Sequence, residues 1–202
     1  MEIDTKAITQ QFDENTPKYT ELKNKVDYIL KKSIKNKNIK IHGVNSRIKG
    51  ISSFIDKIRR KNITRPFEQV HDLVGCRVIC LFLSDLDKIR KILIEEFDVF
   101  EEDDKVNDSE MEFFGYMSLH LKARLKNSYD TLSTNDVGNN ISFEIQVRTI
   151  TQDAWAAISN HLDYKQSTSF IPKELKRDFY ALNGLFYVAD THFSILQKEG
   201  LK

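Results

Sequence analysis

The sequence predicts a layered domain of the α+β (mixed α/β) class, in which helices flank a β-sheet. A nearly continuous apolar run over 72–83 is typical of a central strand that is covered on both faces. Strict alternation of apolar and polar residues over 115–126 and 141–148 is typical of half-buried strands. Apolar residues at helical spacing follow the first and the third of these runs, so strands and helices alternate along the chain.

The composition limits both the size and the partners of the domain. The chain has 202 residues, 40% of them hydrophobic, which suffices for one domain with helical appendages. With 31 basic and 30 acidic residues the net charge is +1, which excludes a global field for non-specific nucleic-acid binding. Any anion site must therefore be local.

The two cysteines and the lack of long apolar runs indicate a reduced, cytoplasmic protein. Cys76 and Cys80 share one predicted strand, with Cα atoms roughly 13 Å apart, whereas a disulfide requires less than about 7 Å. We therefore expect core thiols. The sequence shows neither a signal-peptide pattern nor a run of about 18 apolar residues, so we expect no membrane contact.

Residues 1–40 are predicted to form a helical extension in two pieces. A short helix over 1–14 precedes a second helix that begins at Pro17 and carries an apolar face. The second helix ends in a lysine-rich run: Lys31, Lys32, Lys35, Lys37 and Lys40. Such a run is either a solvated helix end or an anion-binding or regulatory surface.

The predicted main domain, residues 41–165, begins with a short strand over 41–44 and a helix over 45–61. One side of this helix is an apolar seam: Ile48, Ile51, Ile55 and Ile58. The other side carries polar and basic groups: Arg47 at the entrance, then Lys49, Ser53, Lys57 and Arg60. This row can align donors along a polyphosphate, although an ordinary amphipathic helix shows the same pattern.

The apolar strand contains two charges, Asp72 at its entrance and Arg77 in its interior. Charges in such places must be paired or must serve a ligand. After this strand we expect an N-cap at Ser84, a helix over 85–97, a short strand at 99–100 and an acidic loop over 101–112. His71 is isolated in the sequence, and we expect a structural or surface role for it.

Polar residues lie on one face of each alternating strand, and a surface connection over 127–140 joins the two strands. The first face includes Tyr116 and His120, and the second includes Glu144, Gln146 and Arg148. We expect both faces to lie side by side in one sheet. A helix follows with an apolar face: Ala154, Trp155, Ile158 and Leu162.

Residues 166–202 are predicted to form a C-terminal helix whose apolar residues alternate spacings of four and three. The members of this seam are Leu175, Phe179, Leu182, Phe186, Ala189, Phe193 and Leu196. The seam packs either on the helix's own domain or on a partner subunit, which would make the protein a homo-oligomer.

Two carboxylates from separate strands, combined with several cations, are what magnesium-dependent phosphoryl transfer requires. Asp72 and Glu144 can hold a hard cation, while arginines and lysines neutralise a transferring phosphoryl group. Tyr116 offers a ring for base stacking. Each polar face alone also fits a solvated sheet surface, but their combination favours catalysis. The sequence lacks a Walker-type phosphate loop, a G-x-G-x-x-G motif and a zinc-ligand spacing.

Four ordered motifs resemble the synthetase domain of the RelA/SpoT family: HGVNSRIKGISSFIDKIRRK, HDLVGCRV, GYMSLHL and FEIQVRTITQDAWAAISNHLDYK. The length resembles the family's single-domain branch, the small alarmone synthetases. This resemblance implies a nucleotidyltransferase-like mixed β-sheet flanked by helices, with helical N- and C-terminal extensions. It also implies Mg²⁺-dependent transfer of pyrophosphate from ATP to the 3′-hydroxyl of GDP or GTP, which yields the alarmones ppGpp and pppGpp.

The resemblance also implies roles for the candidate residues. Arg47 and Arg77 would enclose the adenine. The ATP phosphates would be contacted by Lys49, Ser53, Lys57 and Arg60. Asp72 and Glu144 would hold magnesium, with Asp72 also placed to help deprotonate the attacking hydroxyl. On the acceptor side Tyr116 would stack on the base, and the groups that orient phosphates and sugar would be His120, Gln146 and Arg148.

The chain departs from the family pattern at one place. Members that make guanosine alarmones usually have a basic segment ending in Pro-Lys-x-Asn before the Gly-Tyr pair, whereas this chain has DSEMEFF before Gly115. An acidic loop there should repel the phosphates of a free nucleotide. Two alternatives to a GDP or GTP acceptor therefore stay open. One is transfer to the 3′ end of tRNA or to adenosine nucleotides, and the other is a non-catalytic nucleotide-binding module.

Overall fold

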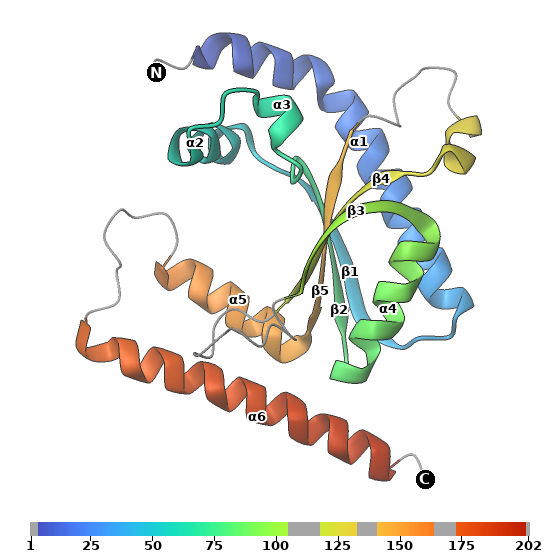
Figure 1. Ribbon diagram of the computed structural model, residues 1–202, viewed down its shortest axis with the longest axis vertical. Helices are drawn as coiled ribbons and strands as arrows, with labels where there is room; N and C mark the ends of the chain where they lie inside the picture. Colours follow the sequence, from blue (N-terminus) through green and yellow to red (C-terminus); the bar gives the residue numbers. More distant parts are fainter. Residues whose placement is uncertain (1–3, 105–117, 133–140, 164–172, 201–202) are drawn as a thin grey trace.

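The structure is a computed structural model that describes residues 4–104, 118–132, 141–163 and 173–200 (Figure 1). Within these ranges the strands are β1 (Ile41–Ile48), β2 (Val74–Cys80), β3 (Phe97–Asp104), β4 (Leu119–Leu125) and β5 (Phe143–Thr149). They form a five-stranded sheet in the order β1-β2-β5-β4-β3. Strands β2 and β5 are parallel, whereas the other neighbours are antiparallel. The predicted mixed sheet is confirmed.

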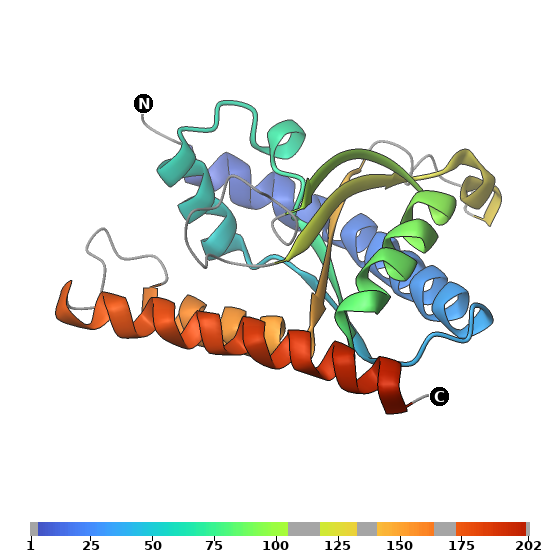
Figure 2. The same cartoon turned by 60° about the horizontal axis from the view of Figure 1, so that its bottom comes forward.

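Helices cover the two faces of the sheet unequally (Figure 1). They are α1 (Thr5–Asn36), α2 (Ile51–Lys61), α3 (Pro66–Gln69), α4 (Leu83–Glu96), α5 (Ile150–Asp163) and α6 (Lys176–Gly200), with short 3-10 turns at Asn127–Leu132 and Lys173–Leu175. Helices α1 and α4 pack on one face, where they enclose the main hydrophobic core. On the other side α2 and α3 lie near one end of the sheet and α5 near the other, with α6 alongside α5 (Figure 2). No helix in the described ranges has the length and apolar character that a bilayer span requires.

The N-terminal extension is one continuous helix, so the prediction of two pieces is wrong. Pro17 lies inside α1, where a proline removes a helical hydrogen bond and costs about 3 kcal/mol. Tertiary packing outweighs this cost, because α1 buries apolar side chains on both sides of the proline. Phe12 and Tyr19, for example, are almost fully buried, with ring centroids 5.6 Å apart.

Strand β1 is longer than the predicted 41–44, and the helix that follows it begins later than expected. Pairing with β2 places Arg47 opposite Gly75 and leaves Lys49 in the connection before α2. The predicted polar row is therefore divided between a strand end and a helix. The ladder with β2 outweighs the helical periodicity of the local sequence, since strand preference depends strongly on neighbouring strands.

Helix α4 and strand β3 also differ from the prediction. The expected N-cap at Ser84 is wrong, because α4 begins without a side-chain cap and the Ser84 hydroxyl donates to Gln197 Oε1 of α6 at 2.9 Å. Residues 101–104, predicted as part of a loop, belong to β3. Glu101 lies opposite Lys122 of β4, and cross-strand pairs of opposite charge favour a sheet.

The alternation predicted for the last two strands is confirmed in β4 and β5. Their apolar side chains are buried in the core: Leu119, Leu121, Ala123, Leu125, Phe143, Ile145 and Val147. The two strands are antiparallel neighbours, so their polar residues share one face of the sheet. Cys76 and Cys80 are free and buried, as expected for core thiols. Tyr116 and the segment 133–140 lie outside the described residues.

The C-terminal helix packs on α5 through only part of the predicted seam. Trp155 of α5 contacts Phe179 and Phe186, with ring-centroid distances of 4.4 and 5.9 Å. The polar residues Asn183 and Asp190 of α6 are buried as well. Apolar residues that we expected inside are exposed: Ile158, Leu162, Leu175, Leu182, Phe193 and Leu196. Polar contacts to the domain therefore help to select the face of α6 that docks.

Burial of Asp190 predicts a pH-dependent cost to stability. Burial raises the pKa of this carboxyl above its ordinary value of 3.8, and the hydroxyls of Thr149 and Thr151, which lower the pKa, offset only part of the effect. As pH rises, the unfolded chain ionises first, so the folded state loses stability until the pH exceeds the raised pKa. Asp190→Asn carries no such ionisation, and its stability relative to the wild type should increase over this range.

Urea unfolding of both proteins between about pH 4 and about pH 7 measures this difference. A difference that stays constant with pH would contradict the prediction. Asp178→Asn changes an exposed carboxylate on the same helix and serves as the control.

Candidate active site

Two carboxylates lie at the boundary between two neighbouring cavities. Asp72 lies just before β2, and Glu144 lies on β5, the parallel neighbour of β2. The register pairs Glu144 with Gly75, which brings both carboxylates to the same end of the strand pair. Both residues line each of the two cavities, so a group bound in either one can reach them.

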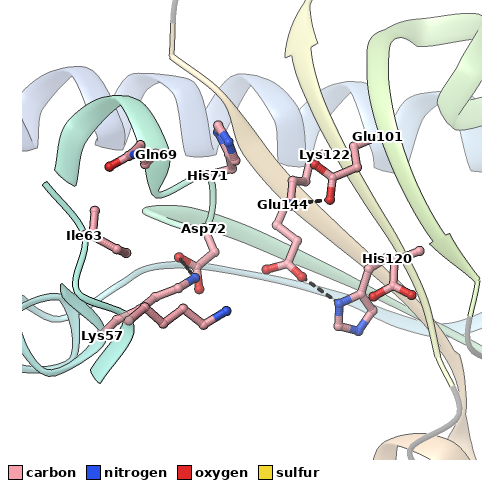
Figure 3. Close-up of a pocket in the computed structure, with 11 residues that line it drawn as sticks. Lys57, Ile63, Gln69, His71, Asp72, Glu101, His120, Lys122 and Glu144 are labelled. Carbon is pink, nitrogen blue, oxygen red and sulfur yellow. Dashed lines mark hydrogen bonds and ion pairs between the residues drawn. The ribbon is translucent and has the colours of Figure 1, made fainter. Parts of the chain in front are cut away.

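The first cavity lies between α2, the segment before β2, and strands β3, β4 and β5 (Figure 3). Apart from the two carboxylates, the charged and polar groups of its wall include Lys57, Lys61, His71, Glu101, Asp103, His120 and Lys122. Figure 3 shows Asp72 and Glu144 directed toward a common space. This cavity therefore combines acidic and basic groups around the shared carboxylates.

The second cavity adjoins the first over β1, β2 and β5. Its wall adds Asn45, Ser46, Arg47, Gly75, Cys76, Arg77 and Gln146. Arg77 lies opposite Asn45, so Arg47 and Arg77 are diagonal neighbours across the β1–β2 pair. Diagonal neighbours on a sheet are about 7–8 Å apart. That spacing admits a planar ring between two guanidinium groups.

Two lysines surround Asp72. Lys49 Nζ lies 2.8 Å from Asp72 Oδ2, and Lys57 Nζ lies 2.9 Å from Asp72 Oδ1. Burial raises the pKa of Asp72, but the hydrogen bonds and charges of the two lysines outweigh burial and hold the pKa below its ordinary value. Asp72 is therefore ionised at neutral pH.

Glu144 is held by a histidine from the neighbouring strand. His120 Nδ1 lies 2.7 Å from Glu144 Oε1. Burial raises the pKa of Glu144, and the negative charge of Asp72 adds to that effect, but His120 and Gln146 outweigh both. The pKa of Glu144 thus lies below its ordinary value, and both carboxylates carry a negative charge at neutral pH.

A third carboxylate, Asp153 of α5, joins two arginines of the site. Arg148 is only 2% exposed, and it donates to Gln146 Oε1 at 2.8 Å and to Asp153 Oδ1 at 3.3 Å. Arg77 Nη1 lies 2.9 Å from the same Asp153 oxygen. Burial and the neighbouring Arg77 lower the pKa of Arg148 to about 10, so Arg148 stays charged at neutral pH.

Most of the predicted site residues that the structure describes converge on these cavities. Those that line a cavity are Arg47, Lys57, Asp72, Arg77, His120, Glu144 and Gln146. Lys49 and Arg148 contact cavity-lining residues directly. Ser53 and Arg60 lie on α2 and are not among the lining residues. Tyr116 lies outside the described part of the chain.

Sequence reasoning missed several members of the site. His71, for which we expected a structural or surface role, lines the first cavity, and its Nδ1 lies 2.8 Å from Ser142 Oγ. Its position next to Asp72 was the available signal. Glu101 and Asp103 line the same cavity, but they were assigned to a loop because β3 was predicted too short. Asp153 stands in the helix after the second alternating strand, and nothing in the sequence shows that it meets two arginines.

Sequence comparisons agree with this geometry. The sequence model described as a region found in RelA / SpoT proteins matches residues 46–169. GTP pyrophosphokinase YwaC from Bacillus subtilis (strain 168) is 30% identical over 171 residues, which cover 79% of this chain and 78% of that protein. GTP pyrophosphokinase YjbM from the same organism is 31% identical over 137 residues, or 67% of this chain. That match spans 62% of the length of YjbM.

A solved structure extends the similarity to the fold. The crystal structure of the small alarmone synthetase 1 from Bacillus subtilis matches with a TM-score of 0.80 at 26% identity. The match covers 95% of this chain and 98% of that one. The family model covers more than half of the chain. The chain belongs to the RelA/SpoT family.

Proposed function

We propose that this protein transfers the β,γ-pyrophosphate of ATP to the 3′-hydroxyl of GDP or GTP and so makes ppGpp or pppGpp. The observation that carries the proposal is the pair of ionised carboxylates, Asp72 and Glu144, which two cavities share. A transferase with two substrates needs such a boundary, because donor and acceptor must meet at one reacting phosphorus. The relatives above are GTP pyrophosphokinases and a small alarmone synthetase, as the motifs predicted.

The second cavity suits the donor ATP. Arg47 and Arg77 would enclose the adenine, as their diagonal placement on neighbouring strands allows. Lys49 and Lys57 reach the boundary, where they would neutralise the phosphates. Ser53 and Arg60 also lie on α2 but are not among the lining residues, so they would contact the ATP phosphates only if ATP extends along this helix.

The first cavity suits the acceptor. His120 and Lys122 of β4 and Lys61 of α2 supply groups that can bind phosphate or sugar oxygens. Glu101 and Asp103 make one side of the same wall negative, and Lys122 Nζ lies 2.5 Å from Glu101 Oε1. Tyr116 would complete the acceptor contacts. This mixture of charges favours a defined acceptor orientation over simple attraction of any anion. Gln146 lines the second cavity and Arg148 donates to Gln146, so both would act on the ATP side and not on the acceptor side that the motifs implied.

In the proposed reaction the acceptor 3′-oxygen attacks the β-phosphorus of ATP. The bond between that phosphorus and the α,β-bridging oxygen breaks, and AMP leaves with the bridging oxygen. The proton of the 3′-hydroxyl passes to Asp72, whose ionised state at neutral pH makes it an acceptor for the proton. Lys49 and Lys57 beside Asp72 would stabilise the negative charge on the transferring group.

Asp72 and Glu144 would also hold Mg²⁺. Two ionised carboxylates that face a common space are hard oxygen ligands, which Mg²⁺ takes together with substrate phosphates. Within the described ranges no three His, Cys, Asp or Glu side chains form a complete metal site, so nucleotide oxygens would complete the coordination. When bound, the ion would neutralise phosphate charge and polarise the reacting phosphoryl group.

Incubation with γ-labelled ATP and a panel of acceptors tests the proposed activity. GDP, GTP, ADP, ATP and tRNA are offered separately with Mg²⁺, and the products are separated by thin-layer chromatography. We expect label in ppGpp or pppGpp. Label only in tRNA or in an adenosine nucleotide product would assign the enzyme to that acceptor. No labelled product with any acceptor, under conditions in which a related synthetase is active, would leave the non-catalytic alternative.

The lysine-rich run bears on the tRNA alternative. Lys31 lies 2.7 Å from Asp27, and Lys37 lies 3.0 Å from Glu95, so part of the basic charge is neutralised within the chain. This favours a free nucleotide over tRNA as the acceptor. If tRNA were the acceptor, Lys35→Glu should weaken the reaction and salt should inhibit it strongly. With GDP or GTP we expect neither effect.

We also propose that the exposed face of α6 contacts a second copy of the chain. The apolar residues of this face are 47–66% exposed: Leu182, Leu185, Val188, Phe193 and Leu196. Contiguous exposed apolar surface marks an interaction site. Light scattering should give a mass above the 23.6 kDa of one chain, and the double variant Leu185→Glu/Leu196→Glu should shift it toward one chain. A wild-type protein at the monomer mass would contradict the proposal.

A further inference from the structure

Helix α6 makes a buried polar contact at the junction between β5 and α5, which the proposed chemistry does not use. Asp190 of α6 is 3% exposed, and its Oδ2 accepts a hydrogen bond from Thr149 Oγ1 at 2.6 Å. Thr149 is the last residue of β5 and is fully buried. Buried carboxylates are costly unless their partners are placed to satisfy them. The contact therefore defines one position for α6 against this junction.

Thr149 also caps the first turn of α5. The backbone N–H of Gln152 donates to Thr149 Oγ1 at 3.2 Å, and the backbone N–H of Thr149 donates to Gln152 Oε1 at 3.0 Å. Reciprocal bonds of this kind satisfy donors at a helix start and set the angle at which the helix leaves the preceding segment. One hydroxyl, on Thr149, thus joins the strand end, the helix start and α6.

The next residue of α5 after this capping turn is Asp153, the carboxylate that joins Arg77 and Arg148. Its Oδ1 lies 2.9 Å from Arg77 Nη1 and 3.3 Å from Arg148 Nη1. The two guanidinium groups repel each other, and Arg148 has almost no contact with solvent. The position of this oxygen therefore helps to orient both guanidinium groups, together with Gln146 Oε1, which accepts from Arg148 at 2.8 Å.

We infer that Asp190 and Thr149 are positioning residues for the ATP side of the site. Through the capped first turn of α5 they hold Asp153 where it orients Arg77 and Arg148, so docking of α6 is coupled to ATP binding. The inference rests on the proposed function, in which the cavity lined by Arg77 receives ATP. If the inference is correct, these substitutions weaken ATP binding specifically, which a general loss of stability would not do.

The matched pair Thr149→Val and Thr149→Ser tests the inference in the full-length protein. Valine keeps the shape but removes the hydroxyl, and serine keeps the hydroxyl. We expect Thr149→Val to raise KM for ATP roughly five- to tenfold, the effect of one lost buried hydrogen bond. KM for the guanosine acceptor should stay within about twofold. Thr149→Ser should restore the wild-type KM for ATP.

A second pair of variants changes Asp190 on α6, and it tests the same inference if Thr149→Val folds poorly. Asp190→Ala removes the oxygen that accepts from Thr149, whereas Asp190→Asn still offers one. The alanine variant should raise KM for ATP in the same way, and the asparagine variant should not. Ser84→Ala is the control, because it removes another contact of α6, the bond to Gln197, without touching α5. We expect no change in KM for ATP from this control.

A double-mutant cycle tests whether Thr149 affects ATP binding through Asp153. If Thr149 acts through Asp153, then Thr149→Val should change KM for ATP by less than about twofold in an Asp153→Asn background. Equal effects in both backgrounds would overturn the inference. So would an unchanged KM for ATP in both Thr149→Val and Asp190→Ala.

A binding assay separates failure of this inference from failure of the proposed function. Fluorescence titration with a labelled ATP analogue gives the same comparison without any transfer reaction. If the wild type binds the analogue but transfers no pyrophosphate, the proposed function fails and the titration still tests the positioning role. If the wild type transfers pyrophosphate and the variants bind ATP as the wild type does, only the positioning role is refuted.

Discussion

Replacement of Glu144 by glutamine should lower the turnover number roughly 10²- to 10⁴-fold, the range expected when a proton-transferring or charge-stabilising group is lost. Glu144 lies on β5 at the boundary of both cavities, and it is ionised because His120 and Gln146 outweigh its burial. Glutamine keeps the shape and one acceptor oxygen for His120 Nδ1. It removes the negative charge that magnesium and the reaction would use.

The initial rate of labelled ppGpp or pppGpp formation measures this effect, with saturating ATP and acceptor. The control is Glu102→Gln, because Glu102 lies on β3 of the same sheet but binds Arg90 at 2.7 Å instead of a cavity group. We expect the control to keep wild-type activity. A Glu144→Gln variant that is folded and fully active would exclude Glu144 from the reaction.

Replacement of Phe54 by alanine should have the largest effect on stability, with a loss of about 3–5 kcal/mol in the free energy of unfolding. Phe54 of α2 has no exposed surface. Its ring centroid lies 5.9 Å from that of Phe12 on α1 and 5.3 Å from that of Phe67 on α3. Alanine would therefore leave a cavity where three helices meet, and the neighbouring rings cannot fill it without moving.

Urea denaturation measures this loss in the free energy of unfolding, with the same dependence on urea concentration (m-value) used for all variants. Tyr28→Ala is the matched control, because Tyr28 is an aromatic residue of α1 that is 63% exposed and should change stability by no more than about 0.5 kcal/mol. The core substitution should also weaken ATP binding, since α2 carries Lys57 beside Asp72. A Phe54→Ala variant as stable as the control would mean that α2 does not share the main core.

Local sequence was a reliable guide where one residue breaks a clear pattern. Arg77 interrupts an apolar strand, and Glu144 alternates with apolar residues, so both were visible before any contact was known. The period of the apolar and polar residues also predicts which side chains are buried, as the alternating burial along β4 and β5 shows. The domain division at residues 40 and 165 and the cytoplasmic location stay predictions.

Local sequence failed where contacts between distant segments outweigh local preference. Pro17 should end a helix, yet α1 continues through it because the helix packs on the sheet. Residues 45–48 have helical periodicity, yet they pair with β2. On α6 the apolar seam is largely exposed, while Asn183 and Asp190 are buried. In each case the energy of a tertiary contact exceeds a propensity difference of at most a few kcal/mol.

The sequence by itself determined the family, the alternation of strands and helices, and the charged residues of the site, because these depend on residue order and period. Only the tertiary structure decided that Asp72 and Glu144 stand between two cavities and that Asp153 joins Arg77 to Arg148. Those relations arise from the parallel pairing of β2 with β5 and from the docking of α5 and α6 beside it. Such contacts join residues far apart in the chain, and no local pattern specifies them.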